Sequence, residues 1–275
     1  MAEVYVNSWE EFVTAVGVAG DTVILPEEAT WDMNEIAPLG VSDIIYIRCA
    51  VIEGRGTRIK NLNITGYFSI ANNITFNDFF LTDFICSGTR DQLFWLQGSN
   101  RTVGFNGCAF SGILSVTAIG FVASGSSNSC SANFMQSSVN VECAGVDFEL
   151  TANLAYHSFK YCRVELHLPN STYGGHIGSG GKTFDFCEMV LYIPKAPRFR
   201  TFSFTGCTVR GNMQLATEYS DSSSGTWRGN VSVYSTDAFG SGFTPYKPQF
   251  FVGVSEEQLK DPAYLRSFGF PIVVV

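Results

Sequence analysis

The sequence predicts an all-β protein, a single-stranded parallel β-helix (solenoid) of about nine or ten coils with short capping helices at both ends. Three observations predict it. An aromatic motif recurs through the middle of the chain, residues within each copy alternate between apolar and polar, and the composition favours one long core. Of the 275 residues, 45% are hydrophobic and only 15% are charged, with 24 Phe and 27 Gly. This balance is typical of a β-rich protein.

We expect a single domain over residues 1–275, because solenoids of this length are often one unit and no segment has the composition of a linker. Residues 1–20 are expected to form an N-terminal cap, residues 21–250 the coils, and residues 251–275 a C-terminal cap. Both ends need a cap, since an open terminal coil would expose a sheet edge and apolar core.

Each predicted cap begins with a helix capping box, Ser8-Trp9-Glu10-Glu11 at one end and Ser255-Glu256-Glu257-Gln258 at the other. Apolar residues follow both boxes at helical spacing, so each helix has a face that can cover the adjacent coil. These faces consist of Trp9, Phe12, Val13 and Val16 in the first helix and of Leu259, Tyr264 and Leu265 in the second, with Gly269 as its stop.

The first coils are predicted from short apolar runs separated by turn glycines such as Gly54, Gly56 and Gly66. Their length and β-branched content favour strands. The runs are Thr22–Leu25, Ile44–Ile47, Arg58–Ile64 and Phe68–Ile70.

The central repeat is an aromatic residue, two further residues, a Cys or a substitute, one residue, and an apolar residue. Successive copies begin 29, 29, 25, 25 and 20 residues apart, which fits one solenoid turn per step with loops of varying length. The copies are Phe76/Phe79/Leu81, Phe105/Cys108/Phe110, Phe134/Ser137/Val139, Phe159/Cys162/Val164, Phe184/Cys187/Met189 and Phe204/Cys207/Val209.

Strand alternation directs Cys162, Val164, Leu166 and Leu168 to the interior. Equivalent residues of successive coils stack about 4.8 Å apart, so the repeat predicts internal ladders. One contains Phe159, Phe184 and Phe204. The other contains Cys108, Cys162, Cys187 and Cys207, interrupted by Ser137. We interpret these thiols as buried and reduced, because small apolar side chains suit a tight corner; a metal ladder or redox site is the alternative.

Composition and charge exclude several function classes. A formal net charge of -8 does not suit a nucleic-acid-binding surface. The start of the sequence has no signal-peptide pattern and no apolar run reaches membrane-spanning length, so we expect cytoplasmic synthesis and no membrane partner. His157, His167 and His176 lack the spacing of a metal site, and we expect neither a metal nor a cofactor.

The N-terminal run Val6–Phe12, the segment Gly20–Leu25 and the strand Ile59–Ile64 resemble pectate-lyase-like right-handed β-helices. More narrowly, Asn7–Trp9 through Trp31–Ile36 and Glu257–Asp261 through Gly269–Ile272 resemble uncharacterised β-helix proteins of phages and prophages. This resemblance implies a right-handed helix and a virion or tail-associated protein, made in the host cytoplasm and located in the virion. Its motifs are structural and imply no particular chemistry.

Polysaccharide-cleaving β-helices provide the enzymatic alternative. Pectate lyases have calcium-binding Asp clusters, but this chain has no Asp-Asp and no Asp-x-Asp. Polygalacturonases share four motifs. Two segments of this chain look like two of them, Arg58-Ile59-Lys60 and Gly175-His176-Ile177-Gly178, but they occur in the reversed order, and the other two motifs are missing. We interpret Arg58–Lys60 as an ordinary strand with Ile59 inward, and His176 as a turn residue.

The densest polar cluster lies on the predicted outside of the fourth and fifth repeats, which align Lys160 with Asp185 and Arg163 with Glu188. Salt bridges between coils are one interpretation. The other is a strip that binds a sugar or a partner, in which Glu165 and Glu188 are the one carboxylate pair that could act in catalysis. The candidate strip consists of Lys160, Arg163, Glu165, His167, Asp185, Glu188 and Tyr192.

Two Ser- and Gly-rich segments, Ala123–Ser131 and Tyr219–Trp227, are predicted lateral loops, and Trp95 and Trp227 could stack on sugars or pack the loops down. Taken together, the sequence predicts a phage or prophage structural protein that binds a virion protein or a host-surface glycan without turnover. It could assemble as a homo-oligomer such as a trimer. The alternative is a tailspike-like polysaccharide depolymerase, a glycoside hydrolase or lyase.

Overall fold

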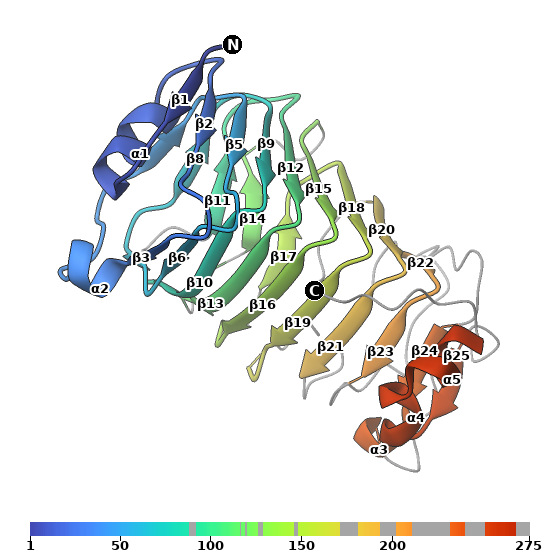
Figure 1. The fold of residues 1–275 in the computed structure, drawn as a ribbon. Helices are drawn as coiled ribbons and strands as arrows, with labels where there is room; N and C mark the ends of the chain where they lie inside the picture. The colour runs from blue at the N-terminus through green and yellow to red at the C-terminus, as the bar shows by residue number, and fades with distance from the viewer. Residues whose placement is uncertain are drawn as a thin grey trace.

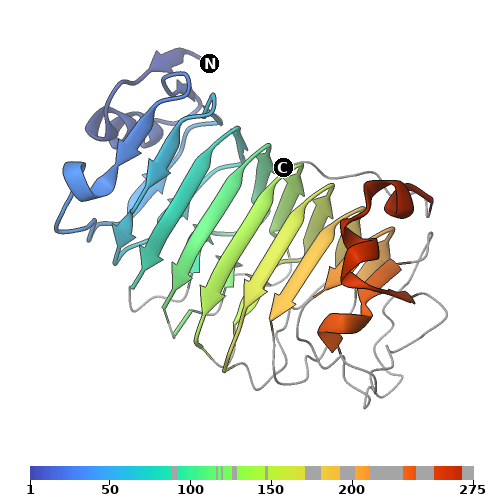
Figure 2. The same ribbon diagram turned by 60° about the horizontal axis from the view of Figure 1, so that its bottom comes forward.

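The computed structural model is a β-solenoid built from parallel strands (Figure 1). It describes residues 1–87, 92–115, 117–118, 120–125, 129–145, 148–170, 181–192, 202–210, 232–239 and 251–267. The strands stack in three parallel sheets, which we call the first, second and third walls. Successive strands of each wall lie side by side along the solenoid axis. Figure 2 shows this for the broad face of the solenoid.

Each wall takes its strands from successive coils. The first wall contains β1 (Glu3–Tyr5), β2 (Thr22–Ile24), β5 (Val51–Glu53), β9 (Ile74–Asn77), β12 (Thr102–Asn106), β15 (Ser131–Met135), β18 (Tyr156–Lys160), β20 (Gly181–Asp185) and β22 (Phe202–Thr205). The second contains β3 (Thr30–Asp32), β6 (Arg58–Lys60), β7 (Asn63–Ile64), β10 (Phe80–Cys86), β13 (Ala109–Leu114), β16 (Ser138–Cys143), β19 (Arg163–His167), β21 (Glu188–Tyr192), β23 (Thr208–Arg210), β24 (Ser232–Ser235) and β25 (Phe251–Val254). The third contains β4 (Ile45–Ile47), β8 (Phe68–Ile70), β11 (Gln92–Leu96), β14 (Gly120–Ser124) and β17 (Glu149–Ala152).

The solenoid has about six turns, so the expectation of nine or ten coils was wrong. A complete turn needs one strand from each wall. Among the described residues the third wall has only five strands, whereas the first has nine and the second eleven. Counting apolar runs along the sequence therefore overestimated the number of turns.

The aromatic repeat aligns in the first wall as predicted. Phe76, Phe105, Phe134, Phe159, Phe184 and Phe204 pair in register from coil to coil. The ring centroids of Phe134 and Phe159 lie 4.5 Å apart and those of Phe159 and Phe184 4.8 Å apart, with nearly parallel planes. The predicted aromatic ladder is thus confirmed as far as Phe184; the side chain of Phe204 lies outside the described part.

The thiol ladder and the inward alternation are also confirmed. Cys162, Val164, Leu166 and Leu168 are all buried, and all eight cysteines are buried free thiols. Three of the ladder thiols donate to a Phe carbonyl of the preceding coil, as Cys187 does to Phe159 at 3.4 Å, and Ser137 donates equivalently to Phe105. The Cys162 thiol donates to Lys160 O of its own coil at 3.4 Å. Burial raises the pKa of Cys108 to about 12, so this thiol is un-ionised at neutral pH.

The turn from the first to the second wall places one residue in the left-handed region, with φ from 45° to 62°. Two of these turn residues are bulky, Tyr161 and Phe186, and their rings stack 5.6 Å apart on the outside. Backbone hydrogen bonds stabilise the turn, because Tyr161 N donates to Asp185 O of the next coil. The residues at this position are Asp78, Gly107, Gln136, Tyr161, Phe186 and Gly206.

Both predicted capping helices form. In α1 (Trp9–Val16) the Ser8 Oγ accepts from Glu11 N, and Trp9, Phe12 and Val16 are buried against the first coils. At the other end α4 (Glu256–Lys260) has a complete capping box at Ser255 and is followed by α5 (Pro262–Ser267). Leu259, Tyr264 and Leu265 pack on a small separate core containing Val233 and Val254. Gly269 lies outside the described residues.

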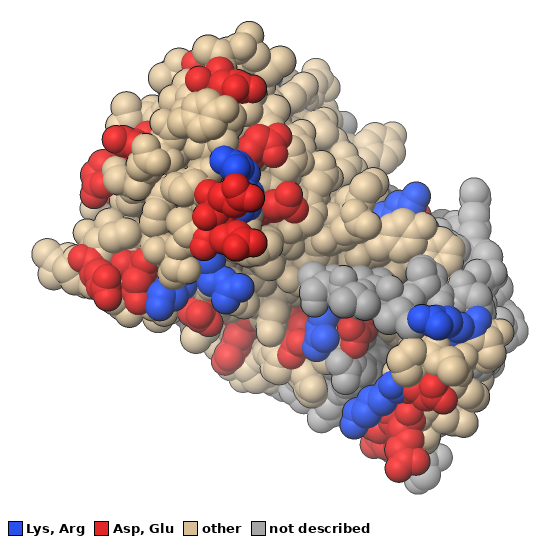
Figure 3. All heavy atoms as spheres, viewed as in Figure 1, with Lys and Arg blue, Asp and Glu red and all other residues tan. Residues whose placement is uncertain are grey.

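Two further short helices, α2 (Met33–Ile36) and α3 (Thr236–Phe239), interrupt the region expected to consist of coils only. In the part of the chain that the structure describes, no helix is long and apolar enough to cross a membrane. On the face in Figure 3, acidic side chains extend from the N-terminal coils to the C-terminal helices, often with basic ones beside them, and no broad basic area is seen.

Candidate binding groove

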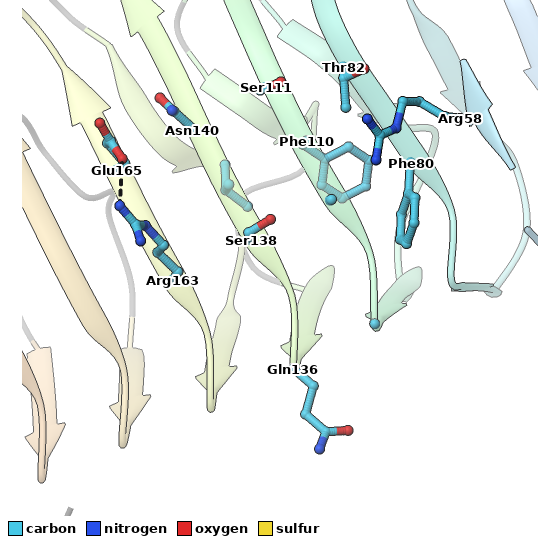
Figure 4. A pocket seen from close by; sticks show the side chains of 13 residues that line it. Arg58, Phe80, Thr82, Phe110, Ser111, Gln136, Ser138, Asn140, Arg163 and Glu165 are labelled. Carbon is cyan, nitrogen blue, oxygen red and sulfur yellow. Dashed lines mark hydrogen bonds and ion pairs between the residues drawn. The ribbon is translucent and has the colours of Figure 1, made fainter. Parts of the chain in front are cut away.

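A shallow groove of about 580 Å³ crosses five strands on the outer face of the second wall, from β6 to β19 (Figure 4). Arg58 and Phe80 line one end of it, and Arg163 and Glu165 line the other. The groove therefore runs along the solenoid axis, across the strands.

The groove exists because side-chain size varies along one outward row of the wall. Arg58, Phe80, Ala109, Ser138 and Arg163 occupy equivalent positions on successive strands. The small side chains of Ala109 and Ser138 leave a hollow, which the longer side chains at both ends delimit. Four strand spacings of about 4.8 Å separate Arg58 from Arg163, so the hollow spans about 19 Å.

A second outward row supplies hydrogen-bonding groups to the same groove. It contains the hydroxyls of Thr82 and Ser111, the amide of Asn140 and the carboxylate of Glu165. Ser111, Asn140 and Glu165 pair in register on β13, β16 and β19. The floor therefore presents one polar group per coil along its length.

A β-bulge shapes the Arg58 end of this row. Thr82 and Asp83 of β10 lie opposite the single residue Ser111, and Asp83 has a φ of 55°. Asp83 N donates to Ser111 Oγ at 3.3 Å, which fixes that hydroxyl. Gly112 is required beside the bulge, because a Cβ there would collide with Phe84 O.

At the other end, Glu165 is bound by both outward neighbours on its own strand. Its carboxylate lies 3.3 Å from the Arg163 guanidinium and 2.9 Å from His167 Nε2, and the side chain is only 17% exposed. Burial raises the pKa of Glu165, but the hydrogen bonds from His167 and Arg163 outweigh burial and lower the pKa below its ordinary value. Glu165 is therefore ionised at neutral pH.

The predicted alignment of Arg163 with Glu188 is confirmed, and the two side chains form an ion pair of 3.5 Å between coils. His167 and Tyr192 also align, and their rings stack 4.4 Å apart. This part of the predicted strip is a network of charged and aromatic contacts that connects β19 with β21.

The predicted salt bridge between Lys160 and Asp185 does not form, although the two residues pair in register. Lys160 Nζ lies instead over the Tyr161 ring, 5.3 Å from its centroid. The reason is the left-handed turn at Tyr161, which brings the outward ring close to the preceding lysine. Both residues lie at strand ends of the first wall, away from the groove lining.

Of the seven strip residues, only Arg163 and Glu165 line the groove. Sequence reasoning assigned Arg58 to an ordinary strand and did not single out Phe80, Ser111, Ser138 or Asn140. The same repeat alignment that predicted the internal ladders could have found them, because they occupy the outward positions of equivalent strands.

The remaining candidates contribute little to the groove. Trp95 is half-buried on the third wall, and His157 is a core residue whose Nε2 lies 3.0 Å from Leu154 O. Three predicted segments lie wholly or partly outside the described residues. They are the loop around His176, the segment Tyr219–Trp227 and the middle of Ala123–Ser131. Within the described ranges, no group of three or more His, Cys, Asp or Glu side chains could bind a metal ion.

No family model matches this chain, and no curated protein or solved structure matches it either.

Proposed function

We propose that this protein is a right-handed, virion-associated β-helix of a phage or prophage that binds an extended host-surface glycan in the groove of the second wall, without cleaving it. The likeness of its two ends to phage and prophage β-helix proteins supports the virion association. The hand is the one that parallel β-strand crossovers almost always take. Assembly into a homo-oligomer such as a trimer is part of the proposal.

The shape and chemistry of the groove support a glycan as the ligand. The groove is open and elongated, and its floor repeats a polar group at the strand spacing of about 4.8 Å. That spacing is similar to the rise of one sugar along an extended polysaccharide. Ser111, Ser138 and Asn140 offer neutral hydrogen-bonding groups, and the half-buried Phe80 offers an aromatic surface to a sugar ring.

One observation argues for binding without turnover: Glu165 is the single carboxylate among the groove-lining residues of the described part. Glycoside hydrolysis of the usual kind needs two carboxyl groups on either side of the bond, one of them protonated. Glu165 is kept ionised by Arg163 and His167, which is the opposite of what a general acid needs. Glu188 is ion-paired with Arg163 and lies outside the groove lining.

The first test measures binding and cleavage of capsular and cell-wall polysaccharides from candidate hosts. We expect the wild type to bind without releasing reducing sugars or unsaturated products. Ser138→Trp should abolish binding by filling the hollow, whereas Thr183→Trp, on an outward position of β20 in the first wall, should bind normally. Binding that survives Ser138→Trp would exclude the groove as the site.

The second test addresses the depolymerase alternative with Glu165→Gln and Glu188→Gln in the same product assay. If the wild type releases products and either substitution abolishes this activity in a folded protein, the protein is a depolymerase and the proposal is wrong. If neither the wild type nor the variants release products, and the polysaccharide is still bound, binding without turnover is supported.

A further inference from the structure

We propose that the groove selects a sparsely acidic glycan, one with a carboxylate or phosphate group on one sugar of its repeat, and that Arg58 binds this group. The inference rests on the proposed glycan binding and adds the class and the orientation of the ligand. It starts from the difference between the two arginines at the ends of the groove.

Arg163 and Arg58 occupy equivalent outward positions four strands apart, yet only Arg163 is neutralised. The Arg163 guanidinium lies 3.3 Å from Glu165 and 3.5 Å from Glu188. Arg58 is exposed and has no ion-pair or hydrogen-bond partner for its guanidinium among the residues that the structure describes. Among the described residues that line the groove, Arg58 is the cation without a charged partner.

The Asp32 carboxylate, on the strand next to Arg58, is used by other groups. Asp32 forms an ion pair of 2.9 Å with Lys60 and accepts a hydrogen bond from Asn61. These contacts, that of Asn61 most of all, lower the pKa of Asp32 and keep it ionised in that pair. Asp32 thus pairs with Lys60, which lies on the same strand as Arg58. Arg58 is therefore left available to a ligand.

The surroundings of Arg58 suit an acidic sugar. Phe80 is its register neighbour and lines the same end of the groove, so a sugar ring on Phe80 would place its acidic substituent within reach of the guanidinium (Figure 4). Thr82 Oγ1, at this end too, is buried without a hydrogen-bond partner. An arginine can bind a carboxylate or a phosphate through two parallel hydrogen bonds, a geometry that a neutral hydroxyl does not match.

The charge of the molecule sets an upper limit on how acidic the ligand can be. The net charge of -8 repels a densely charged polyanion, and the ionised Glu165 repels an anionic group at the far end. The acidic sugar is therefore expected at the β6 end and neutral sugars toward β19, where Asn140 and Glu165 can accept hydrogen bonds from hydroxyls.

The experiment compares three probes by biolayer interferometry on the full chain. They are a host polysaccharide with one uronate per repeat, the same polysaccharide with its carboxyl groups reduced to alcohols, and a host polysaccharide with one phosphate group per repeat. Arg58→Gln should weaken binding of the preferred acidic probe about tenfold or more and leave binding of the reduced polysaccharide unchanged. Arg58→Lys should retain part of the affinity. The two acidic probes distinguish carboxylate from phosphate.

Lys160→Gln is the matched control, because it removes one exposed positive charge outside the groove. It should leave all three affinities unchanged, and the melting temperatures of all variants should equal that of the wild type. Equal loss in Arg58→Gln and Lys160→Gln would overturn the inference in favour of a general electrostatic effect. If the reduced polysaccharide binds the wild type as tightly as the acidic probes, Arg58 recognises no acid, although glycan binding itself stands. If Ser138→Trp weakens the binding of none of the three probes, the proposed function itself is wrong.

Discussion

The outer face of the second wall differs between its two halves, although both consist of parallel strands of the same sheet. Over β10, β13 and β16 the side chains that line the groove are neutral and mostly small, such as Ala109, Ser111 and Asn140. Over β19 and β21 several outward side chains are charged or aromatic and contact one another across the coils, as Arg163 does with Glu188. We refer to these as the groove half and the network half.

Polar side chains on the outside of this solenoid therefore have two distinct roles, connecting coils in one half and remaining accessible to a ligand in the other. In the network half, polar groups are consumed by contacts that connect coils, so little hydrogen-bonding capacity remains for a ligand. In the groove half, hydroxyl and amide groups lie over small side chains and remain accessible. The Phe ladder of the first wall continues along both halves, from Phe105 to Phe184, without a break.

The largest expected change in the free energy of unfolding tests whether the Phe ladder stabilises both halves. Phe105→Ala, beneath the groove half, and Phe184→Ala, beneath the network half, should each lower the free energy of unfolding by roughly 3 to 5 kcal/mol. Both side chains are fully buried, so each truncation leaves a similar cavity. Denaturant unfolding measures both values. A change below about 1 kcal/mol at Phe184 would mean that this residue does not face the core.

The next effect concerns Ser137, the one hydroxyl in the thiol ladder. Its Oγ accepts from Cys108 N at 3.0 Å and donates to Phe105 O at 3.1 Å. Ser137→Ala should lower the free energy of unfolding by about 1 to 3 kcal/mol, because it leaves a buried N–H without an acceptor. Ser137→Cys, which restores the ladder residue, should cost less than Ser137→Ala in the same denaturant titration. An alanine variant as stable as the wild type would contradict this role.

A smaller, pH-dependent effect distinguishes the two halves. The folded pKa of Glu165 lies below its unfolded value, so its ionised form stabilises the fold above about pH 4.3 and this contribution is lost as the pH falls through the folded pKa. Glu165→Gln should cost about 1 to 2 kcal/mol at pH 7 and less at acidic pH.

The register neighbour of Glu165 in the groove half is Asn140, which has no titratable group. Asn140→Ala should therefore show no such pH dependence when thermal unfolding is followed from pH 3 to pH 7. If the stability difference between wild type and Glu165→Gln is constant over this range, the carboxylate is not stabilised by its neighbours.

The smallest effect compares the two arginines. Arg163→Gln removes two ion pairs at a side chain that is 41% exposed, and it should cost about 1 kcal/mol or less. Arg58→Gln removes no ion pair and no side-chain hydrogen bond with a described residue, and it should change the free energy of unfolding by less than about 0.5 kcal/mol. Differential scanning calorimetry measures both. A larger loss for Arg58→Gln than for Arg163→Gln would show that Arg58 is structural.

Much of the interior could be predicted from the sequence. Alternation directed Cys162 and Val164 inward, and the spacing of the aromatic residues set which coils align. The capping boxes at Ser8 and Ser255 marked both terminal helices. The candidate strip was predicted only in part: the pair of Arg163 with Glu188 followed from the alignment, whereas Lys160 with Asp185 did not form.

The sequence by itself determined which residues face the core, because burying an apolar side chain on every second position depends only on the local pattern and the coil repeat. The tertiary structure decided the rest. Left-handed conformations at Tyr161 and Phe186 have no sequence signal, since bulky residues disfavour them. Contacts between coils stabilise them instead: Tyr161 N donates to Asp185 O, and the rings of Tyr161 and Phe186 stack. The hollow between Arg58 and Arg163 likewise depends on the stacking that aligns Ala109 and Ser138 between the longer side chains, and on the bulge at Thr82, which exist only once the coils are stacked.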